Sequence, residues 1–161
     1  MIDSEGHVLL TDFGLSKEGI YDNTSATSFC GSVAYLAPEM LKRSGHGKSV
    51  DWYLLGVLLY EMLFGTPPYY SKSKETLFNN IKRGTLKLPK DINPDTLDIL
   101  KRLLNRNPNK RLGSSSADAD EIKAHPFFSN INWNDVIKRK LVNLKPTLRE
   151  IIPTNFASSI F

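Results

Sequence analysis

The stretch SVDWYLLGVLLYEMLF, residues 49–64, decides the fold class of this protein. Its last twelve residues, Tyr53–Phe64, contain a single charge, Glu61, and at helical spacing their apolar side chains go round the whole circumference. A membrane-spanning helix needs roughly 20 apolar residues, so this segment is too short to cross a bilayer. The pattern therefore predicts a buried core helix over 50–64, with Ser49 as a candidate N-cap.

Helical signals continue downstream of this segment. In SKETLFNNIKRG, residues 73–84, Ser73 is a candidate N-cap and Gly84 a stop signal. In NPDTLDILKRLLNRNP, residues 93–108, Asn93 can cap the helix, a proline occupies the first helical position, and leucines recur at three-to-four spacing. Shorter helices are expected over two further segments, 118–124 and 133–140.

Upstream, the chain lacks a helical period. Turn residues at 3–6 separate Met1-Ile2 from a predicted strand over 7–11, which indicates a short β-hairpin. Residues 12–39 then form a long loop punctuated by glycines and a proline, and loops of this length in a compact domain are usually functional or disordered. The expected fold is therefore mainly α, a helical bundle with a short β-hairpin at its start.

The composition sets limits on the class of protein. With 161 residues, a net charge of +4 and a pI of about 9.1, the chain is an ordinary globular domain with a basic surface. The basic stretches 101–111 and 138–145 lack the interleaved aromatics of a nucleic-acid platform, so no specific nucleic-acid binding is expected. The single cysteine, Cys30, and a start unlike a signal peptide favour the cytoplasm, with the nucleus as an alternative.

Three short motifs stand in an informative order. Asp12-Phe13-Gly14 is followed 25 residues later by Ala37-Pro38-Glu39, and Asp51-Trp52 then opens the apolar helix. This order resembles the C-terminal lobe of a eukaryotic protein kinase, in which DFG binds metal and APE ends the activation segment. Four flanking motifs resemble those of the AGC group: SFCGSVAYLAPE, GTPPYY, NKRLG and HPFF. Within that group, the protein kinase B and glucocorticoid-regulated kinase branch is the most similar.

The resemblance runs through all 161 residues and implies a division of the chain. Residues 1–128 would be a partial kinase domain, and 129–161 a partial C-terminal tail of the AGC type. In that tail, Thr154-Asn155-Phe156 resembles the segment whose aromatic, here Phe156, approaches the adenine site.

The resemblance also implies roles for individual residues. Asp12 would bind Mg²⁺, and Asp51 would anchor the backbone of the catalytic loop. Glu39 would form a buried ion pair with Arg111 that ties the activation segment to the helical core. The alternative for Arg111 is that its side chain only faces water.

Ser28 occupies the family's activation-loop phosphosite, where most relatives have threonine. A phosphate there would add a charge near −2, and Lys17 matches the basic residue that would pair with it. This reading implies an upstream activating kinase as a partner. The alternative is that Ser28 is one more polar loop residue.

Glu61 is the one charge in an apolar helix, and a buried carboxylate is costly unless it is paired or opens onto a surface. By resemblance it would face the peptide groove and select protein substrates with basic, Arg-rich residues before the phosphoacceptor. A structural salt bridge is the alternative. Phe29, Val33 and Leu36 match the apolar pocket for the residue after the phosphoacceptor, although Gly31–Tyr35 departs from the usual Gly-Thr-Pro-Glu-Tyr.

The family's remaining phosphate-binding and catalytic groups precede DFG, and eleven residues cannot hold them. The N-lobe is therefore absent from this sequence, and so is the catalytic-loop aspartate. ATP and Mg²⁺ are expected as cofactors of a full-length kinase, with weak or no binding by this chain alone, which is expected to be inactive. The chain is then either a piece of a longer kinase or a catalytically dead remnant that acts as a protein-binding scaffold.

Overall fold

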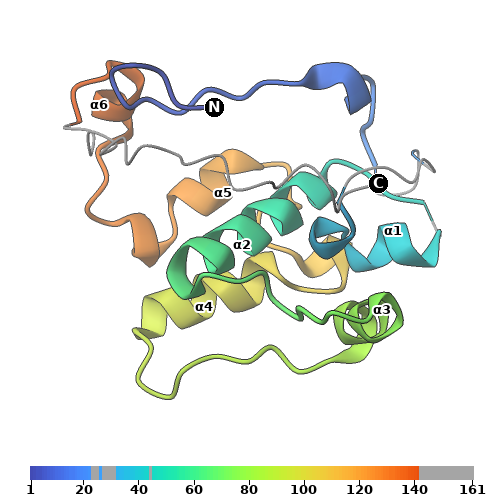
Figure 1. Cartoon of the computed structure of the whole chain (residues 1–161). Coiled ribbons are helices and arrows are strands. Elements are labelled where there is room, and N and C mark those ends of the chain that lie inside the picture. The colour runs from blue at the N-terminus through green and yellow to red at the C-terminus, as the bar shows by residue number, and fades with distance from the viewer. Residues whose placement is uncertain (23–25, 27–31, 44, 142–161) are drawn as a thin grey trace. The chain divides into compact units, whose positions relative to one another are not determined.

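A computed structural model describes residues 1–22, 26, 32–43 and 45–141 (Figure 1). This described part consists of helices, short 3₁₀ turns and loops, which confirms the predicted mainly helical fold class. The chain divides into two compact units, each described here by itself. Unit 1 comprises residues 1–14 with 132–161, and unit 2 comprises residues 15–131. None of the described helices is long and apolar enough to span a membrane.

Unit 1 begins with the predicted turn. The Asp3 carboxylate accepts hydrogen bonds from the backbone N–H groups of Glu5 and His7, and Gly6 has a φ of 86°. The pairing that follows is only an isolated antiparallel bridge between Ile2 and Val8, so the strand predicted over 7–11 does not form. Two-stranded hairpins are marginal by themselves because too few apolar side chains pack on either face.

The rest of unit 1 holds one short helix, α6 (Trp133–Ile137), which ends three residues before the predicted boundary. The Asn132 side chain caps it by accepting hydrogen bonds from the backbone N–H groups of Asn134 and Asp135. Arg139 lies 3.6 Å from the Asp3 carboxylate. Residues 142–161, with the predicted nucleotide-proximal Phe156, lie outside the described residues.

Unit 2 is organised around α2 (Ser49–Phe64), which starts one residue earlier than predicted. Ser49 is not its cap. The helix opens with two tight turns, in which Val50 N–H donates to the Gly47 carbonyl and Asp51 N–H to that of Lys48, so these donors need no side-chain oxygen. The helix ends at Phe64, the predicted boundary, and Gly65 follows in the left-handed conformation that glycine adopts without strain.

The caps predicted for the next two helices are confirmed. Ser73 accepts a hydrogen bond from Thr76 N–H at the start of α3 (Lys74–Arg83), which ends at Gly84. Asn93 accepts from two backbone N–H groups at the start of α4 (Pro94–Leu103). Two shorter helices complete the unit: α1 (Pro38–Lys42) and α5 (Ala119–Lys123).

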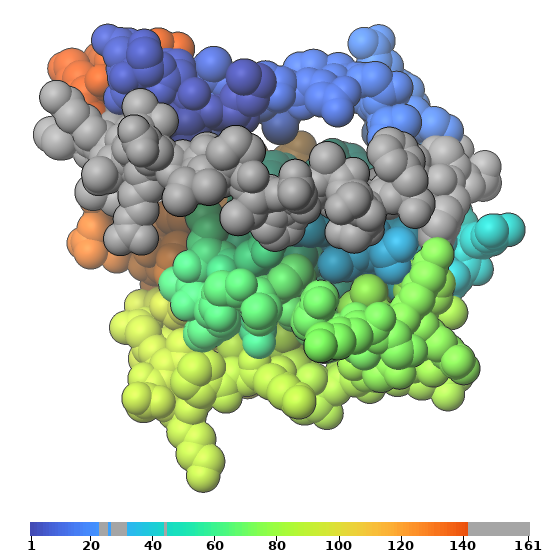
Figure 2. Space-filling model, in the orientation of Figure 1, coloured from blue at the N-terminus to red at the C-terminus, as the bar shows by residue number. Residues whose placement is uncertain are grey.

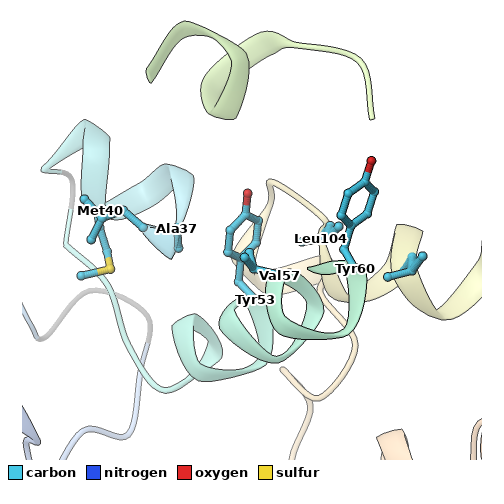
Figure 3. Packing of buried hydrophobic residues seen from close by; sticks show 8 residues of the cluster. Ala37, Met40, Tyr53, Val57, Tyr60 and Leu104 are labelled. Carbon is cyan, nitrogen blue, oxygen red and sulfur yellow. The ribbon is translucent and has the colours of Figure 1, made fainter. Parts of the chain in front are cut away.

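The core lies where α2 packs against α4 (Figure 1). Gly56 permits this contact, because a Cβ at its position would lie 2.8 Å from the Leu103 Cβ. Tyr53 and Tyr60 project in the same direction from this face of α2 and belong to the main apolar cluster (Figure 3). Its buried members are Leu36, Ala37, Met40, Tyr53, Val57, Tyr60, Leu100 and Leu104.

One face of α2 remains open, as expected for an apolar helix that needs protein on every side when the segment that would cover it is missing from the chain. Leu58, Met62 and Leu63 are 46%, 67% and 45% exposed, and atoms of the C-terminal half of α2 reach the molecular surface (Figure 2). The apolar pattern of a helix shows that each face favours burial but does not show which part of a protein covers it. An apolar strip on α2 is therefore available for contact.

Candidate functional site

The most buried charged group of unit 2 is the Arg111 guanidinium. Its two Nη atoms donate to the two carboxylate oxygens of Glu39 at 2.7 and 2.9 Å, a bidentate arrangement. Arg111 also donates to the backbone carbonyls of Ser49 at 2.7 Å and Asn105 at 3.0 Å, and its guanidinium carbon lies 5.0 Å from the centre of the Tyr53 ring. One cation therefore joins the starts of α1 and α2 to the segment that follows α4.

This pair is fully removed from water. The side chains of Arg111 and Glu39 are 0% and 5% exposed, so a purely solvent-facing Arg111 does not agree with the geometry. A buried ion pair is tolerated when its hydrogen-bonding capacity is filled, as it is here. Burial also raises the pKa of the adjoining Tyr53 hydroxyl, which keeps that group neutral.

A second polar group surrounds the first turn of α2. The Trp52 indole Nε1 donates to Asp118 Oδ1 at 2.8 Å, and Lys48 Nζ lies 3.4 Å from Asp118 Oδ2. Asp51, the predicted catalytic-loop anchor, is exposed in the same turn. Partial removal from water raises its pKa, and the negative charge of Asp118 raises it further. Sequence reasoning missed Asp118, because only its place near a helix start was visible.

Glu61 meets Tyr35 at the surface of unit 2. The Tyr35 hydroxyl donates a close hydrogen bond to Glu61 Oε2, and both residues are half-buried. Tyr35 belongs to a 3₁₀ turn, Val33–Tyr35. Among the described residues, no lysine, arginine or histidine forms an ion pair with Glu61, so the alternative of a structural salt bridge gains no support there.

The residues predicted for the apolar substrate pocket have different environments. Val33 is half-buried beside Tyr35, whereas Leu36 is buried within the core cluster. Phe29 and the predicted phosphosite Ser28 lie outside the described residues.

Lys17, the predicted phosphate partner, is exposed, and its positive charge contributes to a lowered pKa of His46, although burial is the larger cause. The backbone of His46 pairs with that of Ala26 through two hydrogen bonds of 2.8 and 3.0 Å. Ala26 precedes Ser28 by two residues. The positive charge of Lys17 therefore affects the pKa of His46, the residue whose backbone pairs with Ala26.

Asp12, the predicted metal ligand, belongs to unit 1 and is exposed. Its φ of 64° is in the left-handed region, which is uncommon for a residue other than glycine. Among the described residues, no group of three or more His, Cys, Asp or Glu side chains lies close enough together to hold a metal ion. Asp12 alone can offer a carboxylate oxygen, a ligand type that suits Mg²⁺.

Comparison with known proteins decides the family. The sequence profile described as protein kinase domain matches residues 1–128, which contain Asp12, Glu39, Asp51, Glu61 and Arg111. The chain belongs to the protein kinase family. It is 41% identical to the RAC-beta serine/threonine-protein kinases of Rattus norvegicus and Homo sapiens, and 43% identical to the RAC-beta serine/threonine-protein kinase A of Xenopus laevis.

These kinase relatives match the whole of this chain over 162 aligned residues. They are AGC kinases, so the predicted resemblance to that group is confirmed. The chain spans about a third of their length, 34% in the two mammalian proteins and 33% in the frog protein. The mainly helical structure of this segment is consistent with the C-terminal lobe of a kinase.

The Tyr35–Glu61 contact of this kinase segment can be tested through the pKa of the Tyr35 hydroxyl. The hydrogen bond to Glu61, followed by burial and the nearby negative charge, raises the pKa of the Tyr35 hydroxyl. Because the folded pKa is raised, the stabilisation is present below the ordinary tyrosine pKa, about 10, and is lost as pH rises through the folded value.

We expect Glu61→Gln to lower the pKa of Tyr35 toward its ordinary value, measured by NMR of ¹³C-labelled tyrosine. The exposed Glu75 in the first turn of α3 provides the matched control, Glu75→Gln, which should leave the Tyr35 titration unchanged. Equal Tyr35 titrations in the Glu61→Gln and unsubstituted chains would contradict the contact.

Proposed function

We propose that this chain forms the C-terminal-lobe portion of an ATP-dependent protein serine/threonine kinase. In this proposal it carries the metal-binding Asp12, the activation segment and a surface for peptides with arginine before the phosphoacceptor. The observation that carries the proposal is the pairing of Glu61 with a neutral hydroxyl, that of Tyr35.

The chemistry of this pair favours a cationic ligand. Tyr35 bonds to Oε2 and brings no positive charge to Glu61, and the acceptor capacity of Oε1 is not used by this bond. A guanidinium presents several N–H donors in one plane and is well suited to a half-buried carboxylate. A peptide arginine would then supply the charge partner that Glu61 lacks among the described residues.

The cofactors belong to the same proposal. Asp12 would supply one oxygen ligand to Mg²⁺, and the ATP phosphates would supply others. The metal ion neutralises negative charge on the transferred phosphoryl group. Phosphorylation of Ser28 by an upstream kinase would place a dianion that Lys17 could pair with.

We further propose that the 161-residue polypeptide by itself does not catalyse phosphoryl transfer. Its sequence has no glycine-rich phosphate loop and no catalytic-loop aspartate. A second function, that of a non-catalytic protein-binding scaffold, is favoured by one observation, the exposed apolar strip of α2. A scaffold would form a stable protein complex through that strip without phosphoryl transfer.

A chimera tests the proposal. This chain replaces the 162 matched residues of the human RAC-beta kinase, and the chimera is assayed with two peptides that differ only in arginine or alanine before the phosphoacceptor. We expect preference for the arginine peptide. Since a hydrogen bond to a charged group contributes about 1.5–3 kcal/mol, Glu61→Gln should reduce that preference roughly 10- to 150-fold.

Glu75→Gln is the matched control in the chimera, because Glu75 is exposed at the start of α3. It should leave the preference intact. An arginine preference that survives Glu61→Gln unchanged would contradict the assigned role of Glu61.

A further inference from the structure

The first turn of α2 is held by a segment distant in sequence. Asp118, 66 positions after Trp52, accepts the indole N–H at 2.8 Å. Gly113 lies against the same ring, since a Cβ there would be 2.7 Å from Trp52 Cδ1 and 2.8 Å from its Nε1. Lys48, directly before the helix, reaches the second oxygen of Asp118. These contacts restrict the turn that carries Asp51.

Asp118 is itself held in an unusual backbone conformation, with φ 51° and ψ −121°. This left-handed region is sparsely populated by residues other than glycine, and such conformations persist where the surroundings impose them, often at functional sites. Here both carboxylate oxygens are engaged, one by Trp52 and the other by Lys48. The strain and the engaged carboxylate together indicate a positioning role.

We propose that Asp118 is the positioning residue for Asp51: by holding the Trp52 indole, it orients the first turn of α2 so that the Asp51 carboxylate remains turned outward as a hydrogen-bond acceptor. This inference rests on the proposed role of Asp51 as an anchor for backbone N–H groups of a catalytic loop. Among the described residues, no hydrogen bond to the Asp51 side chain is formed, so its acceptor capacity is available.

The electrostatics agree with this placement. Partial removal from water raises the pKa of Asp51 most, and the negative charge of Asp118 raises it further. A carboxylate whose ionised form is disfavoured gains more from incoming N–H donors than a fully hydrated one, because those donors stabilise the ionised form. The charge of Asp118 therefore increases the stabilisation that Asp51 would gain from hydrogen bonds donated by backbone N–H groups.

Two substitutions separate charge from geometry. Asp118→Asn keeps an oxygen for the Trp52 indole and removes the charge, whereas Asp118→Ala removes both. The dilute full chain is labelled with ¹³C-aspartate and ¹⁵N-tryptophan and titrated by NMR. We expect both variants to lower the Asp51 pKa, and only Asp118→Ala to move the Trp52 indole resonance strongly and accelerate its hydrogen exchange.

Asp120→Asn is the matched control, since Asp120 is exposed and pairs with Lys123. It should change neither signal. An Asp51 pKa that is unaltered in both Asp118 variants, or an indole resonance that is unaltered in Asp118→Ala, would overturn the inference.

The kinase chimera provides a separate functional arm. Asp118→Ala should lower its turnover several-fold more than Asp118→Asn does, because the asparagine retains the indole contact. If the unsubstituted chimera is inactive, the proposed function fails, and the Asp51 and Trp52 signals of the full chain still decide the positioning role. Equal turnover of the unsubstituted and Asp118→Ala chimeras would overturn the inference and leave the proposed function standing.

Discussion

Arg111→Met should destabilise unit 2 strongly and lower its urea unfolding midpoint. The substitution preserves much of the side-chain volume but leaves the Glu39 carboxylate buried with no cation, and it removes the donors to the Ser49 and Asn105 carbonyls. Breaking a buried ion pair from one side costs about 3–5 kcal/mol. A whole domain has only about 5–15 kcal/mol of net stability, so this loss consumes much of it.

The measurement is urea unfolding followed by far-ultraviolet circular dichroism. Arg102→Met is the matched control, because Arg102 forms an exposed pair with Asp98, and such surface pairs contribute about 0–1 kcal/mol. Adding Glu39→Leu to Arg111→Met should restore part of the stability, since no unpaired charge then remains. Similar midpoints for Arg111→Met and Arg102→Met would contradict the structural importance of the pair.

The free chain should bind a hydrophobic dye strongly and associate as its concentration rises. Leu58 and Met62 lie one helical turn apart on α2 and so are neighbours on its surface, and Leu63 is exposed on the same helix; these three residues make up the apolar strip. Contiguous exposed apolar surface marks an interaction site or an aggregation liability. Replacing all three residues with glutamine should reduce dye fluorescence several-fold and favour the monomer in analytical ultracentrifugation.

The control for this prediction is Val8→Gln with Leu10→Gln, two exposed apolar residues of unit 1. These substitutions should change dye binding much less, because they leave the α2 strip intact. Strong dye binding that persists after the triple substitution would contradict the prediction, because the dye would then bind an apolar surface other than the α2 strip.

Local signals in the sequence account for most of the helices. The caps at Ser73 and Asn93 could be predicted because the capping side chain and the backbone N–H that donates to it lie within three residues of each other in the sequence. The start of α2 was harder, since its first donors bond to backbone carbonyls and leave no side-chain signature at Ser49. The isolated bridge at Ile2 shows that turn residues alone do not ensure a strand.

The candidate site depends on contacts between distant residues, which local patterns do not reveal. The Glu39–Arg111 pair joins positions 72 apart and was anticipated only through resemblance to the kinase family. The Trp52–Asp118 contact, at a separation of 66, was missed because neither residue type specifies its partner. The bond from Tyr35 to Glu61 became visible only when the fold brought a loop hydroxyl to α2.

Phosphoryl transfer by the chimera tests the central claim most directly. The chain, in place of the matched residues of the human RAC-beta kinase, is supplied with Mg²⁺ and radiolabelled ATP, and label in a basic peptide is counted. We expect transfer by the chimera, its near-complete loss in Asp12→Ala, and its retention in the surface control Asp120→Ala. A chimera that is folded but inactive beside an active parent kinase, or one equally active with Asp12→Ala, would contradict the claim that this chain supplies a working kinase lobe.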